Sequence, residues 1–167
     1  GSKRMVSIDL HSGQIQGFFE GPVDHLTAMP VLENYVRANA RDGVTIVSPD
    51  AGRVKVAERF AQHLADMDAD VAFINKRRPK GTTNVAEAKE VIGDVDGRLC
   101  ILADDMIDTG GTIVSAADLL FKRGAKEVWA MATHGVLSGP AIERLENSSI
   151  SRVVLTNSLP LPVEKRI

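Results

Sequence analysis

The chain has 167 residues, of which 44% are hydrophobic and 25% are charged, and its formal net charge is −2. This length is enough for one domain with a substantial core, and the low charge provides no overall attraction to nucleic acid or to an anionic membrane. No apolar run reaches the roughly 18 to 20 residues of a membrane helix, and the single Cys100 lies in the run LCILA, typical of a buried thiol in a reducing cytoplasm.

Six short apolar runs rich in β-branched residues predict buried strands. In chain order they cover residues 5–8, 44–48, 70–75, 98–103, 127–133 and 152–156. Apolar side chains three or four positions apart predict helical segments over 54–64 and 113–120. Alternation of this kind is typical of an α/β fold, with a mostly parallel sheet in three layers and helices on both faces. Residues 76–86 form a long polar loop.

Gly1 and Ser2 resemble a cloning scar, so we expect a single domain over residues 3–167 and a natural sequence that starts upstream. A sheet of the predicted type binds ligands beyond the carboxyl ends of its strands. Polar or charged side chains follow each predicted strand: Asp9 and His11; Asp50; Lys76, Arg77 and Arg78; Asp104, Asp105 and Asp108; His134; Asn157.

The stretch ILADDMIDTGGTIVSAADLL reads as strand, turn and helix. Gly110 and Gly111 allow backbone angles that other residues avoid, so the amides of residues 108–112 can form a concave cage at the start of the helix. The hydroxyls of Thr109 and Thr112 add donors, and the helix dipole adds partial positive charge. This turn therefore predicts a site for a phosphate monoester.

Asp104 and Asp105 would lie next to that phosphate, where carboxylates can accept hydrogen bonds from a vicinal diol or contact a metal through water. A phosphate in the turn and a diol on the acids describe ribose 5-phosphate. The alternative is an ordinary capping turn with acids that only solvate a strand end. The tripeptide Asp108-Thr109-Gly110 also occurs in aspartic proteases, but those need an all-β frame and a second facing carboxylate.

The motif ADDMIDTGGT is similar to the phosphoribosyl pyrophosphate motif of the type I phosphoribosyltransferase fold. Together with SIDLHSGQIQGFF, IVSPDAGRVKVAERFA, INKRRPK and ATHGVLSGPA, it resembles the ribose-phosphate diphosphokinase family along nearly the whole chain. The DLHSGQIQGFF stretch discriminates most, because base-transferring relatives lack it. Family members also have an amino-terminal domain that is absent here, and Arg53 stands where many have glycine.

The resemblance implies the roles of individual residues. Asp104, Asp105, Asp108, Thr109, Gly110, Gly111 and Thr112 would bind ribose 5-phosphate. His11 and Asp50 would bind Mg²⁺, although a lone histidine is often structural and Asp50 could instead cap a turn. Lys76 and Arg78 would be the catalytic pair; on an extended backbone they share one face, and the alternative is a solvated basic turn.

The implied reaction is synthesis of 5-phosphoribosyl 1-pyrophosphate, in which the diphosphoryl group of ATP passes to ribose 5-phosphate. The resemblance further implies a cytoplasmic enzyme and a homo-oligomer in the full-length form, with no nucleic-acid or membrane partner. Two other functions stay open: a base-transferring phosphoribosyltransferase, and a regulatory module that binds a sugar phosphate without catalysis. No GxxxxGK[ST] motif is present, so ATP is not held by a P-loop.

Overall fold

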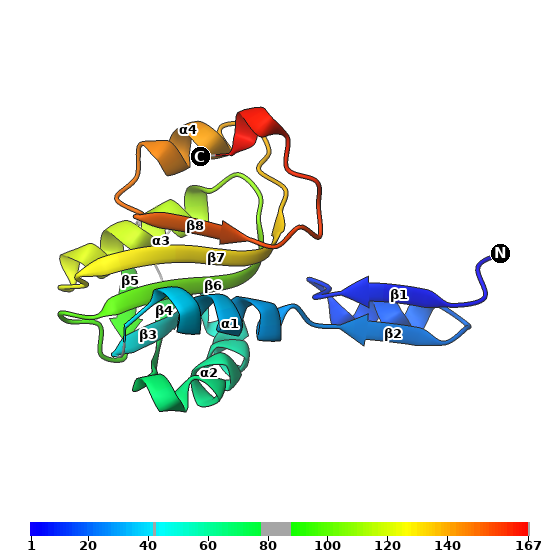
Figure 1. Cartoon of the computed structure of the whole chain (residues 1–167), viewed down its shortest axis with the longest axis horizontal. Coiled ribbons are helices and arrows are strands. Elements are labelled where there is room, and N and C mark those ends of the chain that lie inside the picture. The colour runs from blue at the N-terminus through cyan, green and yellow to red at the C-terminus, as the bar shows by residue number, and fades with distance from the viewer. Residues whose placement is uncertain (42, 78–87, 167) are drawn as a thin grey trace.

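The main sheet has the strand order β5-β4-β3-β6-β7-β8, in the part of the chain that the computed structural model describes, residues 1–41, 43–77 and 88–166 (Figure 1). Every neighbouring pair is parallel except β4 and β5. The strands are β3 (Val44–Ser48), β4 (Asp70–Arg77), β5 (Ala88–Ile92), β6 (Leu99–Ile107), β7 (Glu127–Gly135) and β8 (Arg152–Leu155). The predicted mostly parallel sheet is therefore confirmed.

Helices cover both faces of this sheet, as predicted (Figure 1). The helices are α1 (Met29–Asn39), α2 (Val54–His63), α3 (Gly111–Lys122) and α4 (Ala141–Glu146). Along β6, Cys100 and Leu102 pack with α3 and α4, whereas Ile101 packs with α1 and α2. A strand buried on both faces needs a continuous apolar run, and this requirement explains the LCILA sequence. Burial also raises the pKa of the Cys100 thiol to about 12.

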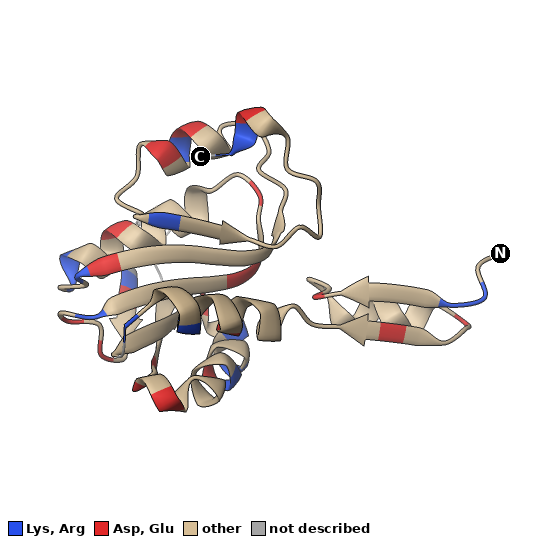
Figure 2. Cartoon of the chain, viewed as in Figure 1, with Lys and Arg blue, Asp and Glu red and all other residues tan. Residues whose placement is uncertain are grey.

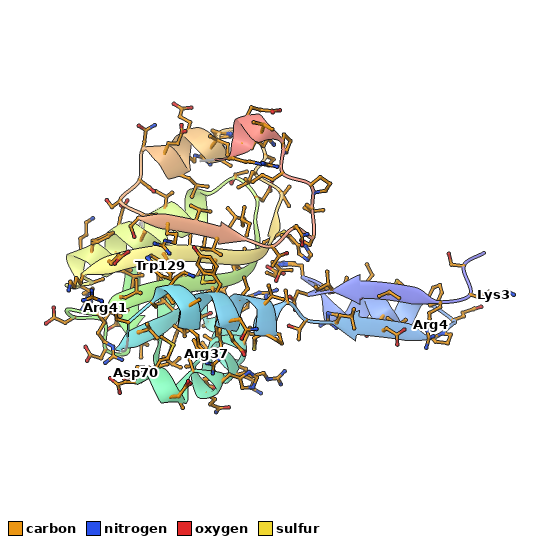
Figure 3. The ribbon with its side chains drawn as sticks, in the orientation of Figure 1. Lys3, Arg4, Arg37, Arg41, Asp70 and Trp129 are labelled. Carbon is orange, nitrogen blue, oxygen red and sulfur yellow. The ribbon has the colours of Figure 1, made fainter. Side chains whose placement is uncertain are left out.

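One apolar contact shows how α1 is attached to the sheet. The ring of Trp129 on β7, which is labelled in Figure 3, meets Tyr35 of α1 edge to face, with 6.4 Å between the ring centroids. The guanidinium of Arg152 on β8 lies 4.4 Å from the centroid of Trp129, a cation–π distance.

In the described part of the chain, no helix has the length and hydropathy that a bilayer crossing would need.

The strand order reverses between β3 and β6. From β3 the chain proceeds to β4 on one side, and from β6 it proceeds through β7 to β8 on the other. The carboxyl ends of β3 and β6 therefore flank the switch point, where open α/β sheets bind their ligands. In Figure 2 an acidic segment marks the carboxyl end of β6, which contains Asp104 and Asp105.

The first predicted strand is a strand but does not belong to the main sheet. Strands β1 (Met5–Ile8) and β2 (Val23–Leu26) form a separate parallel pair that projects from the body, with Lys3 and Arg4 at its far end (Figures 1 and 3). We call residues 1–27 the arm. The expectation of a buried strand was wrong here, since Val6 is 62% exposed. A four-residue apolar run indicates a strand but not the sheet in which it pairs.

Hydrogen bonds attach the arm to the body at the end of β1. The carboxylate of Asp9 accepts from the Ala28 amide at 2.9 Å and from the Thr133 hydroxyl at 2.6 Å. The ring Nε2 of His134 lies 3.0 Å from the carbonyl oxygen of Ile8. Asp9 has a φ of +39°, in the left-handed region that non-glycine residues rarely adopt. The arm is thus fixed at its root by side chains from β7.

Two further differences from the sequence-based prediction concern the strands β6 and β5. Strand β6 continues to Ile107, so Asp104 and Asp105 lie on the strand rather than after it, and only Asp108 begins the turn. Strand β5 was not predicted, because its sequence AKEVI has no apolar run; it pairs antiparallel with β4 at the edge of the sheet. Short 3₁₀ turns cover Gly13–Phe18, Ala51–Arg53, Ala65–Met67 and Val163–Lys165.

Candidate functional site

The two adjacent acids on β6, which we call the acid pair, form the centre of the site. Oδ2 of Asp105 accepts a hydrogen bond from Arg53 Nη2 at 2.5 Å, and it lies 2.8 Å from His11 Nδ1. Arg53 Nε is also 3.5 Å from Asp104 Oδ1. The side chain of Asp105 is only 2% exposed, and that of Asp104 is 18% exposed. Three segments far apart in sequence therefore converge on one buried carboxylate.

The two acids differ in protonation. Burial, followed by the hydrogen bond with Asp105, raises the pKa of Asp104 to about 7. Burial alone would also raise the pKa of Asp105, but the hydrogen bond with Asp104 and the charges of Arg53 and His11 lower it overall. Like charges this close do not both ionise easily, so the pair holds a proton near neutral pH. Such a pair can bind a hydroxyl group both as donor and as acceptor.

The two residues assigned to a metal lie in different surroundings. His11 lies in the arm, shortly after β1, and contacts Asp105, so the structure brings it to the acid pair. Asp50 lies in the turn between β3 and α2, where its Oδ1 accepts from the Gly52 amide at 2.8 Å. This contact is the turn-capping role that was the alternative for Asp50. Among the described residues, no group of three or more metal-binding side chains is present.

The turn between β6 and α3 is exposed at its two ends, whereas Gly110 is buried and Gly111 is half-buried. Asp108, Thr109 and Thr112 are exposed, and Gly110 has a φ of +74°, which glycine adopts without strain. Within the described chain, the amides of residues 108–110 donate to no other protein group. Helix α3 begins at Gly111, so its unpaired first amides and the positive end of its dipole lie at the same place. The turn can hold an oxyanion.

Asp108 differs from the acid pair because its partner is a hydroxyl group. Ser138, in the loop after β7, donates from Oγ to Asp108 Oδ1, and its amide donates to the Asp108 carbonyl oxygen at 3.0 Å. The carboxylate therefore has a fixed direction at the entrance to the turn. Sequence analysis did not identify Ser138, because this contact joins residues that are 30 positions apart.

Of the two predicted catalytic cations, Lys76 belongs to β4. The backbone of Lys76 pairs with Lys89 of β5, which confirms the extended backbone there. Arg78 lies outside the described residues. The roles of both residues stay predictions.

A cavity of about 360 Å³ opens beside the acid pair, between the root of the arm, α1 and α2. Its polar lining includes both members of the pair together with Asp9, His25, Arg53, Arg59 and Thr133. Sequence analysis noted Arg53 only as a departure from glycine. Its place directly after Gly52, at the switch point, was the available signal, but its contact with the acid pair depends on tertiary structure.

Comparison with known proteins gives consistent matches. The sequence model of the phosphoribosyl synthetase-associated domain matches residues 67–166. The ribose-phosphate pyrophosphokinase of Streptomyces avermitilis is 56% identical over 165 residues, which are 98% of this chain and 50% of that protein. The corresponding enzyme of Bifidobacterium longum is 53% identical over 169 residues, which are 99% of this chain and 49% of that protein.

Solved structures agree with the sequence matches. The phosphoribosylpyrophosphate synthetase from Mycobacterium smegmatis superposes with a TM-score of 0.90 at 48% identity, over 100% of this chain and 53% of that one. The purine phosphoribosyltransferase from Pyrococcus horikoshii superposes over 97% of each chain with a TM-score of 0.55 at 19% identity, and this likeness concerns the fold alone. The chain spans about half the length of its curated relatives.

Proposed function

The chain belongs to the ribose-phosphate pyrophosphokinase family, and from this premise we propose that it carries the ribose 5-phosphate site of such an enzyme. The whole enzyme would transfer the diphosphoryl group of ATP to the 1-hydroxyl of ribose 5-phosphate and release AMP. One observation carries the proposal: the amides of residues 108–110 donate to no other group in the described chain, Asp108 and Thr109 are exposed, and the acid pair lies a few residues earlier on β6.

The turn and the acid pair would bind different parts of the substrate. The 5-phosphate would accept hydrogen bonds from the amides of residues 108–112 and from the hydroxyls of Thr109 and Thr112, with support from the α3 dipole. The ribose hydroxyls would then meet Asp104 and Asp105. The amides of residues 108–110 would be available to an oxyanion, because no other group in the described part of the chain accepts from them.

Catalysis would depend on position and charge rather than on covalent chemistry. The 1-hydroxyl must lie in line with the phosphoryl group that it attacks, and the fixed acid pair would hold the sugar in that orientation. Lys76 and Arg78 would stabilise negative charge as AMP leaves. Exclusion of water would prevent hydrolysis of ATP, which competes with the transfer.

This site offers some of the oxygen ligands that Mg²⁺ prefers. It prefers a few carboxylate oxygens and completes its coordination with water and substrate phosphates. Asp105 Oδ1 is buried without a hydrogen-bond partner, so the acid pair has an acceptor to spare. We assign His11 and Asp50 as the protein ligands, which would be joined by substrate oxygens because no cluster of three is preformed in the described residues. When bound, the ion would neutralise charge on the diphosphoryl group.

Calorimetric titration of this chain with ribose 5-phosphate in the presence of Mg²⁺ tests the proposal. We expect saturable binding, with competition by inorganic phosphate but not by ribose. Absence of binding by ribose 5-phosphate and by phosphoribosyl pyrophosphate would rule the proposal out. Release of AMP from ATP would separate an active enzyme from a regulatory module that only binds. A base-transferring enzyme would instead release diphosphate from phosphoribosyl pyrophosphate when a nucleobase is added.

We propose further that the full-length protein is a cytoplasmic homo-oligomer. The buried thiol of Cys100, which would not form a disulfide, fits a reducing compartment. Light scattering of the full-length protein measures the assembly directly.

A further inference from the structure

The loop after β7 lies against one side of the 108–112 turn. We call residues 136–144 the backing segment; it contains the loop and the first part of α4. The contact is close, because a Cβ atom added at Gly110 would lie 3.5 Å from the carbonyl oxygen of Ala141. On the other side, Asp108, Thr109 and Thr112 are exposed. The turn therefore has one face against protein and one face that is accessible.

Three consecutive carbonyl groups of the turn accept hydrogen bonds from the backing segment. The Ile107 oxygen accepts from the amides of Val136 and Leu137 at 3.1 and 3.0 Å. The Asp108 oxygen accepts from the Ser138 amide at 3.0 Å. The Thr109 oxygen accepts from a side chain, Arg144 Nη1, also at 3.0 Å.

A trans peptide unit is planar, and its carbonyl and the following amide point in opposite directions. The carbonyls of Ile107, Asp108 and Thr109 all point toward the backing segment, so the next three amides point away from it. These are the amides that donate to no other group in the described chain. The hydrogen bonds behind the turn thus determine the direction of the donors in front of it.

We propose that Arg144 is a positioning residue, which holds the Thr109–Gly110 peptide so that the Gly110 amide points at the bound phosphate. The inference rests on the proposed function only for the identity of that anion. Backbone amides hold the first two carbonyls, but the third depends on one exposed side chain. Gly110 can adopt either sign of φ, so without Arg144 this peptide is free to rotate and turn its amide away.

Arg144 also carries a positive charge beside the turn, and this charge alone would attract a phosphate. Two measurements on the 167-residue chain separate position from charge. The first is NMR relaxation of the Gly110 and Gly111 amides without any ligand, with relaxation dispersion to detect slower peptide rotation. The second is the dissociation constant for ribose 5-phosphate. The variants are Arg144→Ala and Arg144→Lys, with Arg123→Ala as the control for charge at the opposite end of α3.

In Arg144→Ala we expect the order parameter of the Gly110 amide to fall from about 0.85 to below about 0.6, or slow exchange of this amide to appear in relaxation dispersion. The order parameter of the Leu145 amide should not change. The dissociation constant should rise about tenfold, the effect of losing one charge-assisted hydrogen bond. Arg144→Lys should be intermediate in both measurements, because lysine keeps the charge and one donor but lacks the planar fork. Arg123→Ala should change each less than twofold.

A Gly110 amide that remains as ordered in Arg144→Ala as in the unchanged chain would overturn the inference, whatever happens to the affinity. Weaker binding with an ordered turn would mean that Arg144 acts only as a nearby cation. If the unchanged chain binds neither ribose 5-phosphate nor inorganic phosphate, the proposed function fails, but the ligand-free relaxation data still decide the role of Arg144.

Discussion

Arg53 and Asp105 meet across the point where the strand order of the sheet reverses, with 2.5 Å between Nη2 and Oδ2. Arg53 belongs to the turn after β3, and Asp105 belongs to the last part of β6. This contact and the one from His11 compensate a carboxylate that is almost completely buried. The ion pair between Arg53 and Asp105 therefore links the stability of the sheet to the geometry of the proposed sugar site.

Replacement of Arg53 by alanine should lower the free energy of unfolding by about 1–3 kcal/mol at pH 8, because the buried Asp105 carboxylate loses its guanidinium partner. Urea denaturation of both proteins measures the difference. The control is Arg59→Ala, an exposed arginine that lines the same cavity and should cost little. Equal stability of Arg53→Ala and the unchanged chain would show that the ion pair contributes nothing.

The raised pKa of Asp104 predicts a pH-dependent effect of Asp104→Asn. The folded chain holds the proton up to about pH 7, whereas the ordinary pKa is 3.8. The stability from this group is therefore complete below about pH 4 and is lost progressively as the pH rises to about 7. We expect Asp104→Asn to gain stability relative to the unchanged chain across this range and then to keep a constant advantage. Denaturation at several pH values measures it, and a pH-independent difference would contradict the assignment.

Asp108→Asn and Lys76→Ala should affect different steps. Asp108→Asn should weaken ribose 5-phosphate binding about tenfold, since a directed acceptor becomes an amide. Lys76→Ala in the full-length enzyme should lower kcat by one hundredfold or more with little change in that affinity, because it removes a contact made in the transition state. Calorimetry and steady-state kinetics distinguish the two. Equal losses of affinity in both variants would mean that the roles are wrongly assigned.

Two adjacent glycines should respond differently to the same substitution. Gly110→Ala forces a side chain into the left-handed region and should cost about 1–2 kcal/mol of stability. At Gly111 the added Cβ would only approach the movable end of Arg144, at 3.4 Å, so Gly111→Ala should be neutral or slightly stabilising. Thermal unfolding of the two variants measures this contrast, and an equal loss in both would indicate steric crowding rather than backbone strain.

Thr133→Val should loosen the root of the arm. The variant keeps the shape of the side chain but loses the 2.6 Å hydrogen bond to the Asp9 carboxylate. A lost hydrogen bond to a charged group shifts the opening equilibrium about tenfold or more. Limited proteolysis should then cut within residues 1–27 faster while the rest of the chain stays intact. The control is Thr45→Val, which removes a hydrogen bond away from the arm, the one that the Thr45 hydroxyl donates to the Asp94 carbonyl oxygen.

The central strands could be predicted from sequence because their environment is uniform. Every residue of Val44–Ser48 is buried, so a nearly continuous run of β-branched residues predicted a strand that is covered on both faces. The run Met5–Ile8 looks similar in sequence, yet it pairs with β2 outside the body. Strand β5 has no such run; its pairing with β4, for example Phe73 with Ile92, depends on contacts distant in sequence.

The same distinction applies to the site. The turn at residues 108–112 could be predicted because glycines, hydroxyls and a helix start are all local features. The partners of the turn could not, since Arg144 is 35 residues from Thr109 in sequence, and Arg53 is 52 residues from Asp105. Their positions follow from the order of the strands, which the pattern of apolar residues did not determine.

The attachment of the arm at Asp9 gives its motions a fixed pivot. His11 is two residues from this pivot, whereas Met5 is four residues along an extended strand, at roughly 13 Å. A small rotation about Asp9 would displace the outer end of the arm farther than it displaces His11. Movement of the protruding tip would thus reach the acid pair with reduced amplitude, because the contact between His11 and Asp105 lies close to the pivot.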